Sequence, residues 1–142
     1  MQPLHSKIAV VAGATRGAGR AIAVELGAAG ATVYCTGRSV RGAPSDMNRS
    51  ETIDETAEMV TKRGGTGIAV RVDHTKPDEV QALFARVNSE QNRQLDILVN
   101  DIWGGEDLSE WGKPFWELSL DKALTMIERA ILTSSRVATV PP

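Results

Sequence analysis

The most constraining feature of the sequence is one stretch, from Lys7 to Gly30, in which an apolar run, a glycine-rich loop and a helical pattern follow one another. The apolar run, residues 8–12, is rich in branched side chains, as is typical of a strand covered on both faces. Residues 20–28 carry apolar side chains at helical spacing, and Gly30 can end that helix as a C-terminal cap. The stretch therefore predicts a buried strand that turns directly into a helix.

Between the strand and the helix lie three glycines, Gly13, Gly17 and Gly19, at the spacing G-x3-G-x-G. Glycine lets the chain turn sharply and lets backbone N–H groups come close to a ligand. The start of the following helix presents N–H donors and the positive end of a dipole, which favour a phosphate or diphosphate. A structural turn is the alternative, but the place of the loop between strand and helix favours a dinucleotide site. The loop is not of the Walker type, because no Gly-Lys-Ser/Thr ends it.

Composition narrows the class of protein further. A chain of 142 residues has room for one domain with a proper core, so we expect residues 1–142 to form a single domain. Its 16 basic and 18 acidic residues give a net charge of -2, which offers no electrostatic reason to expect nucleic acid or a membrane as partner. The lone Cys35 and the lack of an evident signal peptide or spanning run favour a cytoplasmic protein. We expect no metal site.

The alternation of strand and helix patterns continues along the chain. Further strands are predicted at residues 31–36, 67–72 and 95–99, and further helices at residues 51–63, from about 75, and 120–138. At the start of the third helix, Thr75 is the predicted cap, Pro77 fits the first turn and Asp78 stands where a capping-box acid would. The pattern predicts an α/β fold of the Rossmann type, a doubly wound parallel sheet of about four strands with helices on both faces.

Two later segments are less regular. Residues 106–117 hold several aromatic side chains without a clear period, so we expect a long loop. The aromatic residues are Trp111, Phe115 and Trp116. They could cover a ligand, but we favour the interpretation that they pin the loop to the body of the protein. Residues 131–135 could form a strand, yet a helix is favoured because a strand would leave too short a crossover.

Polar side chains at the strand ends indicate which nucleotide is bound. In doubly wound folds the ligand lies beyond the carboxyl ends of the strands. An acidic residue after the second strand usually binds the ribose 2′-hydroxyl of NAD, whereas this chain has Arg38, followed by Ser39 and Arg41. Since a guanidinium holds a phosphate bidentately, and Arg16 lies in the glycine loop, we predict NADP(H) over NAD(H). The alternative is that Arg38 is a solvated loop residue.

These residues resemble the short-chain dehydrogenase/reductase family. Its fingerprint, Thr-Gly-x3-Gly-x-Gly, is matched by residues 12–19 except that Ala12 replaces the threonine. By resemblance, Asp73 stands where the family holds the adenine amino group, and Asn100 matches the first residue of its Asn-Asn-Ala-Gly motif, here continued as Asp-Ile-Trp-Gly-Gly. The candidate cofactor-binding residues are therefore Gly13, Thr15, Arg16, Gly17, Ala18, Gly19, Arg38, Asp73 and Asn100.

The resemblance implies hydride transfer between a nicotinamide cofactor and a carbonyl or alcohol substrate. The family uses a tyrosine as acid and base, a lysine four residues later and a serine. Here the only tyrosine is Tyr34, followed four residues later by Arg38, and Ser134 and Ser135 on a helix cannot replace the serine. We therefore identify no catalytic residue and expect a cofactor-binding half, truncated before a fifth strand, that is inactive alone and meets its substrate only in a full-length form.

Several interpretations remain open at this point. The leading one is the N-terminal part of an NADP-dependent oxidoreductase, whether a truncated product, a partial sequence or a protein that needs a partner. A second is a non-catalytic dinucleotide-binding module or partner subunit. A third, weaker one is another doubly wound enzyme, such as a nucleotide-sugar or methyl-transfer protein. An unpaired edge on the fourth strand would favour self-association into a homo-oligomer.

Overall fold

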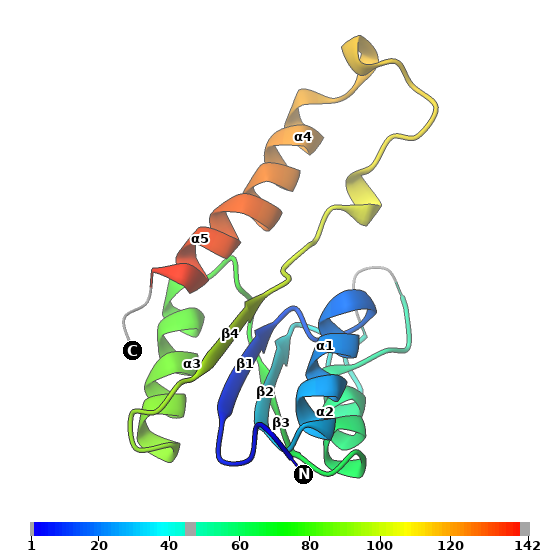
Figure 1. Ribbon diagram of the computed structural model, residues 1–142. Coiled ribbons are helices and arrows are strands. Elements are labelled where there is room, and N and C mark those ends of the chain that lie inside the picture. Colours follow the sequence, from blue (N-terminus) through cyan, green and yellow to red (C-terminus); the bar gives the residue numbers. More distant parts are fainter. Residues whose placement is uncertain (1, 45–47, 140–142) are drawn as a thin grey trace.

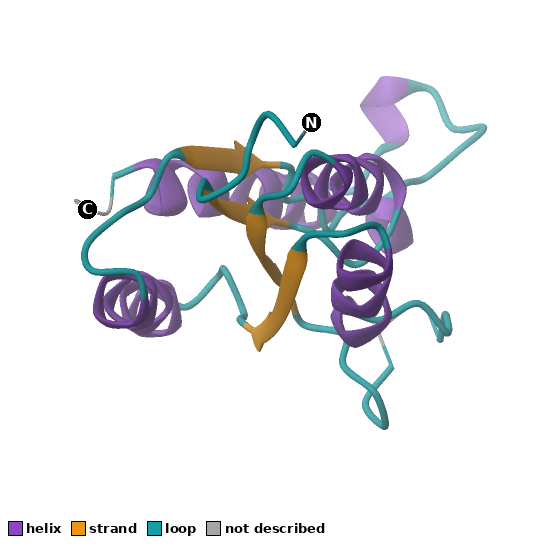
Figure 2. Ribbon diagram, turned by 60° about the horizontal axis from the view of Figure 1, so that its bottom comes forward, coloured by secondary structure: helices purple, strands orange, loops and turns teal. Residues whose placement is uncertain are grey.

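The computed structural model describes residues 2–44 and 48–139. Within them, four parallel strands form one sheet in the order β3-β2-β1-β4, and helices cover both of its faces (Figures 1 and 2). The predicted doubly wound α/β fold is confirmed. The strands and helices are β1 Ile8–Ala12, α1 Gly17–Ala28, β2 Thr32–Gly37, α2 Ile53–Lys62, β3 Thr66–Arg71, α3 Pro77–Glu90, β4 Ile97–Asn100, α4 Leu120–Ile127, a π-helical turn Glu128–Leu132, and α5 Thr133–Ala138.

Strand β1 lies at the centre of the fold because it pairs with β2 on one side and β4 on the other. All five of its residues are buried, as its unbroken apolar run predicts. Alternate side chains enter two separate cores. Val10 packs with residues of α3 and α5, such as Leu83 and Val137, while Val11 packs with residues of α1 and α2, such as Ala23 and Val60.

The start of α3 differs from its predicted form. The cap residue is Lys76, and the prediction that Thr75 caps the helix is wrong. Thr75 instead turns back to Asp73: its backbone N–H and its hydroxyl both donate to the Asp73 Oδ1, over 3.0 and 2.6 Å. Short polar side chains often form such local turns in competition with helix capping. The acid that reaches back is Glu79, not Asp78, since its Oε2 accepts the Asp73 N–H over 2.7 Å.

Residues 120–138 form one continuous helical segment, so the alternative strand at residues 131–135 is wrong. The segment changes from α to π geometry over Glu128–Leu132 and then returns to α. A π turn leaves carbonyl groups poorly paired, and here the Thr133 hydroxyl lies 2.5 Å from the Arg129 carbonyl oxygen and 3.2 Å from that of Ala130. Thr133 and Val137 are buried and fix this end of the helix to the body.

Beyond β4 the chain leaves the sheet and returns through α4, a segment of residues 104–127 that we call the arm (Figure 1). Apart from two short 3-10 turns, residues 106–117 form the predicted loop. Its aromatic side chains, however, do not pin it to the body: exposed fractions are 90% for Trp111, 79% for Phe115 and 73% for Trp116. Among the helices of the described residues, none is both long and apolar enough to cross a membrane.

Candidate functional site

The glycine loop leaves β1 between the ends of its two neighbouring strands. The N–H groups of Gly13 and Ala14 both donate to the Thr36 carbonyl oxygen of β2, over 3.1 and 2.9 Å. On the other side, a Cβ atom on Gly13 would lie only 2.2 Å from the Asp101 carbonyl oxygen, and its φ angle is +92°. Both the crowding and the left-handed backbone exclude any side chain at this position.

Gly19 and Gly17, the other two glycines of the motif, have different structural roles. A Cβ atom on Gly19 would lie 2.2 Å from the Gly13 carbonyl oxygen, so Gly19 lets the first turn of α1 pack directly on the loop. Gly17 begins α1 at a φ of +59°, and a Cβ atom there would meet nothing within 4 Å. Gly17 therefore leaves open space beside the first turn of the helix, whose N–H groups have no acceptor within the helix. This arrangement fits the diphosphate of a dinucleotide.

A cavity of about 330 Å³ lies over this loop, at the carboxyl ends of the four strands of the described sheet. Its lining joins residues that follow every one of these strands, from Gly13 after β1 to Asp101 after β4. This is the edge at which doubly wound folds bind their ligands. Most of the predicted cofactor-binding residues line it: Gly13, Thr15, Arg16, Gly17, Ala18, Arg38 and Asp73.

Two predicted site residues are not part of this lining. Gly19 lies beneath the loop, where it contacts Gly13. The Asn100 side chain turns toward α5, and its Nδ2 donates to the Ser134 carbonyl oxygen over 2.8 Å. Asn100 therefore joins the end of β4 to the helix that packs beside it, and in this structure its amide acts as a structural link.

The charged groups on the β2 and β3 side of the cavity interact with one another. Burial raises the pKa of Asp73, but hydrogen bonds from Thr75 and the positive charges of Arg38 and Lys76 outweigh it, so that the pKa is lowered overall. Asp73 is therefore ionised at neutral pH and can accept hydrogen bonds from a ligand. Its carboxylate and the Arg38 guanidinium give this end of the cavity one acceptor and one cation.

His74 forms part of the wall beside Asp73. It is 5% exposed, and its Nε2 lies 3.0 Å from the Thr36 hydroxyl oxygen. Burial lowers its pKa to about 4, and the Arg38 charge acts in the same direction, while the charges of Asp73 and Glu79 oppose it. At neutral pH the imidazole is uncharged, so His74 contributes shape and a hydrogen bond to Thr36.

The β4 side of the cavity includes residues that were not among the predicted cofactor-binding residues. Four of them continue the motif that begins at Asn100, and three lie further along the chain: Asp101, Ile102, Trp103 and Gly104, then Glu106, Arg129 and Thr133. Arg129 organises this side, because its Nη1 donates to the Gly104 carbonyl oxygen over 3.0 Å and pairs with Asp107 over 3.2 Å. Arg129 and Thr133 are four residues apart on the helical segment, so they share a face. The four-residue spacing of Arg129 and Thr133 within the helix predicted at residues 120–138 is the sequence feature that could have pointed to these two residues.

Tyr34, the only tyrosine of the chain, does not line the cavity. It is fully buried in β2, and its hydroxyl donates to Glu90 Oε2 and accepts from Gln91 Nε2, each over 2.8 Å. Glu90 ends α3, whereas Pro77 starts that helix near the carboxyl ends of the strands. The Tyr34 hydroxyl therefore lies toward the opposite edge of the sheet from the cavity. Within the described residues, no group of three His, Cys, Asp or Glu side chains is placed to hold a metal ion.

Comparisons with known proteins agree with this fold. A mouse protein named dehydrogenase/reductase SDR family member 1 is 39% identical over 118 residues, which are 82% of this chain and 34% of the relative. An Arabidopsis thaliana chloroplastic NADPH-dependent aldehyde reductase-like protein is 33% identical over 99 residues, 69% of this chain and 36% of the relative. The chain thus spans about a third of the length of these curated relatives.

Solved structures extend the likeness to the whole described fold. A short chain dehydrogenase from Mycobacterium thermoresistibile superposes with a TM-score of 0.79 at 25% identity, over 95% of this chain and 45% of that protein. A hydroxysteroid dehydrogenase from Escherichia coli gives a TM-score of 0.74 at 26% identity, over 96% and 51% of the two chains. Residues 7–137 match the family described as short chain dehydrogenase. With the glycine loop and the cavity at the strand ends, this match shows that the chain belongs to the short-chain dehydrogenase/reductase family.

Proposed function

We propose that this chain is the cofactor-binding part of an NADP(H)-dependent oxidoreductase that acts on a carbonyl or alcohol substrate. The observation that carries the proposal is the cavity itself, which combines an open glycine loop with two arginines, Arg16 and Arg38. When bound, the nicotinamide would donate or accept the hydride. The residues of this chain would bind and orient the cofactor, and the substrate would be met in the full-length form.

Each part of the cavity suits one part of the cofactor. The first turn of α1, at Gly17 and Ala18, offers N–H groups and a positive dipole end to the diphosphate. Thr15 adds a hydroxyl to the loop that lines the cavity. The ionised Asp73 would accept a hydrogen bond from the adenine amino group. The roles of Gly13 and Gly19 are to make the close turn possible, and Asn100 would act by fixing the end of β4.

The preference for NADP(H) rests on the residues that follow β2. No acidic residue stands there to bind a free ribose 2′-hydroxyl, since the strand ends in Gly37 and continues as Arg38 and Ser39. The Arg38 guanidinium can hold a phosphate in two parallel hydrogen bonds. The name of the Arabidopsis relative, which describes an NADPH-dependent protein, points in the same direction.

Among the described residues that line the cavity there is no tyrosine. The family's Tyr-x3-Lys pair is absent from its sequence, and Tyr34 is buried with its hydroxyl held by Glu90. General acid catalysis needs a group within hydrogen-bond reach of the reacting atom. We therefore expect the isolated chain to bind the cofactor and to reduce no carbonyl compound.

The test is a fluorescence titration of the chain with NADPH and with NADH. We expect tighter binding of NADPH, and we expect Arg38→Asp to weaken NADPH binding about ten- to hundredfold and to reverse the preference, because charged hydrogen bonds contribute about 1.5–3 kcal/mol. Arg63→Asp is the matched control, since Arg63 caps the far end of α2 and pairs with Glu25. An unchanged NADPH to NADH ratio in Arg38→Asp would discard the assignment.

A further inference from the structure

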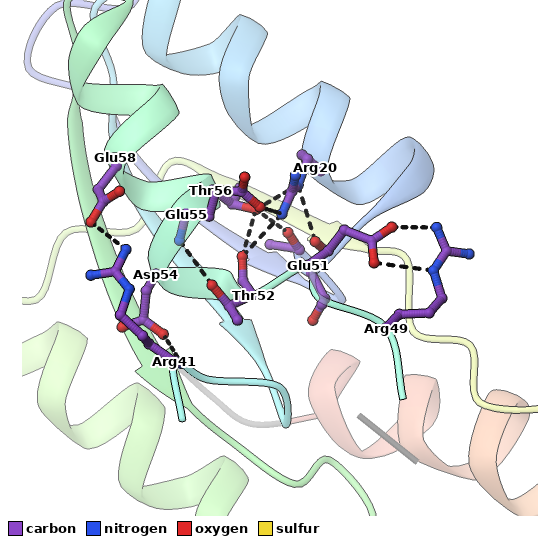
Figure 3. A network of polar contacts seen from close by, with 11 residues as sticks. Arg20, Arg41, Arg49, Glu51, Thr52, Asp54, Glu55, Thr56 and Glu58 are labelled. Atoms are coloured by element: carbon purple, nitrogen blue, oxygen red, sulfur yellow. Dashed lines mark hydrogen bonds and ion pairs between the residues drawn. The ribbon is translucent and has the colours of Figure 1, made fainter. Parts of the chain in front are cut away.

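Two carbonyl groups of the glycine loop are held by side chains that come from the helices behind it. The Thr56 hydroxyl, on α2, donates to the Ala14 carbonyl oxygen over 2.9 Å. The Arg20 Nε, on α1, donates to the Thr15 carbonyl oxygen over 3.0 Å. Figure 3 shows Arg20 and Thr56 facing each other between the two helices. Neither residue belongs to the lining of the cavity.

The two side chains also hold each other. Arg20 Nε lies 3.0 Å from the Thr56 hydroxyl oxygen, and its Nη2 donates to the Thr52 carbonyl oxygen over 3.2 Å and pairs with Glu55 over 2.7 Å. Thr56 is fully buried, and the Arg20 side chain is only 18% exposed. Partly buried, charge-assisted hydrogen bonds of this kind are far better defined than surface ion pairs. Arg20 and Thr56 thus form a clamp on the loop.

The clamp decides where the N–H groups of the loop point. In a trans peptide the carbonyl of one residue and the N–H of the next point in opposite directions, and the described residues contain no cis peptide. Holding the Ala14 carbonyl toward Thr56 and the Thr15 carbonyl toward Arg20 therefore turns the N–H groups of Thr15 and Arg16 away from these two side chains. Both residues line the cavity, so this is the side from which a diphosphate would approach.

The same turn of α2 also fixes the segment that carries Arg38. The Ile53 N–H donates to the Ser39 carbonyl oxygen over 3.0 Å. The Arg41 N–H donates to Asp54 Oδ2 over 2.8 Å. The start of α2 is therefore bonded to the glycine loop on one side and to the segment after β2 on the other, which sets the distance between the two regions proposed to bind phosphate.

We propose that Arg20 and Thr56 are positioning residues of the dinucleotide site: they orient two loop peptides so that their N–H groups face the diphosphate. This inference rests on the proposed function and deepens it. It assigns a role in cofactor affinity to two side chains that do not touch the cavity. It also makes α2 the element that keeps the diphosphate region in register with the 2′-phosphate region.

Thr56→Val tests the clamp with little change of volume. It removes the hydroxyl that holds the Ala14 carbonyl, so we expect NADPH binding to weaken about tenfold. Binding of 2′-AMP, which lacks the diphosphate, should stay within about twofold of the wild type. Thr56→Ser keeps the hydroxyl and should restore NADPH binding to within about twofold. Equal weakening of both ligands in Thr56→Val, or unchanged NADPH binding, would overturn the proposal.

Thr61→Val is the matched control on the same helix. Its hydroxyl donates to the Ala57 carbonyl oxygen over 3.0 Å and accepts the Gly67 N–H over 3.1 Å, at the end of α2 away from the loop. Its loss should lower the melting temperature, as in Thr56→Val, while both ligand affinities stay unchanged. A fall in NADPH affinity that simply follows the melting temperature in the two variants would contradict a positioning role.

Arg20 is tested separately, because its charge alone could attract an anionic cofactor. Arg20→Lys keeps the charge but cannot bond the loop carbonyl, Thr52 and Glu55 together, so we expect NADPH binding to weaken about tenfold. Glu55→Gln leaves the bond from Arg20 to the Thr15 carbonyl in place and should change NADPH affinity less than about threefold. Full NADPH affinity in Arg20→Lys would show that only charge matters and would overturn the role of Arg20.

A measurement without ligand separates this inference from the proposed function. The ¹⁵N–¹H resonances of the Thr15 and Arg16 amides should shift in Thr56→Val and stay in place in Thr61→Val. If the wild type binds neither NADPH nor 2′-AMP, the proposed function fails, whatever these amides show. If the wild type binds NADPH but the two amides do not respond to Thr56→Val, only the clamp fails.

Discussion

The body of the protein and the arm use apolar residues in opposite ways. In the body, every residue of β1 is buried, and Val10 and Val11 enter two cores on the two faces of the sheet. In the arm, the large apolar side chains lie at the surface of the described structure: Trp111, Phe115, Trp116, Leu120 and Leu124. Because folding free energy comes mainly from burial of apolar surface, the body should supply nearly all of the stability of this chain.

The arm is held in place mainly by contacts of the helical segment that follows it. Arg129 bonds the Gly104 carbonyl and pairs with Asp107, while Thr133 and Val137 anchor the helical segment to the body. The large apolar side chains of the arm named above add little to this anchoring, because they lie at the surface. Matched substitutions in the two regions should therefore differ sharply in their cost.

The largest difference is expected for glycines with a left-handed backbone. In Gly13→Val the new Cβ would lie 2.2 Å from the Asp101 carbonyl oxygen, so we expect a loss of more than about 4 kcal/mol or no cooperative folding. Gly112, in the arm, has a φ of +85° with nothing within 4 Å of a Cβ. Gly112→Val should thus cost only the backbone strain, about 1–3 kcal/mol. Urea unfolding measures both losses, and equal losses would contradict the difference in packing between body and arm.

Leucine truncations test the same contrast for side-chain packing. Leu83, on α3, is 2% exposed and belongs to a buried core, whereas Leu124, on α4, is 55% exposed. Leu83→Ala should lower the free energy of unfolding by about 3 kcal/mol through lost burial and a cavity. Leu124→Ala should change it by less than about 0.5 kcal/mol. The denaturant midpoints of the two variants, compared at an unchanged slope m, measure both changes in the free energy of unfolding. A loss in Leu124→Ala as large as that in Leu83→Ala would show that Leu124 packs against other residues.

The body should also respond to pH through His74. Its pKa is lowered to about 4 by burial, so the folded state resists protonation while the unfolded state takes up a proton near pH 6.5. The resulting stability is present above about pH 6.5 and is lost as pH falls toward 4, by about 2 kcal/mol between pH 7 and pH 5. His74→Gln should remove this part of the slope. The measurement is the free energy of unfolding of the wild type and of His74→Gln between pH 7 and pH 5. An equal loss in both proteins would contradict the role given to His74.

The smallest effect is expected at the tip of the arm. Trp111 is 90% exposed, so Trp111→Ala should change the free energy of unfolding by less than about 0.5 kcal/mol. The wild-type tryptophan fluorescence should be readily quenched by acrylamide, and the variant should lose part of the quenchable signal. A loss of stability above about 1 kcal/mol would mean that the ring packs against other residues in solution.

The fold could be predicted from the sequence because local patterns and global topology agree in the body. The apolar run of β1 predicts a buried strand, and the helical spacing of α1 predicts a helix. Because the links between strands and helices are short, this alternation favours a parallel sheet with helices on both faces. Errors arose where side chains had competing partners. Thr75 bonds to Asp73 rather than to the helix that it was expected to cap. The arm aromatics carry no period, so the sequence held no information on what they contact.

The candidate site could be predicted only where it follows the strands directly. The glycine loop, Arg38 and Asp73 line the cavity because a parallel sheet brings its carboxyl ends to one edge. Arg129 and Thr133 reach the cavity from a distant helix, and that approach depends on tertiary packing. Asn100 also follows a strand, yet its amide bonds to Ser134, because a side chain at a strand end can turn to either side of the sheet.

The π turn at Glu128–Leu132 makes the length of this helix as important as its composition. Each residue of an α-helix rotates the chain by about 100°, whereas a π turn takes up one extra residue with little change in the relative rotation of the helices on either side. Deleting one residue within the turn would therefore restore α geometry and leave the arm close to its present direction relative to Thr133 and Val137. The same deletion within α4, which has no extra residue to lose, would swing the arm by about 100°.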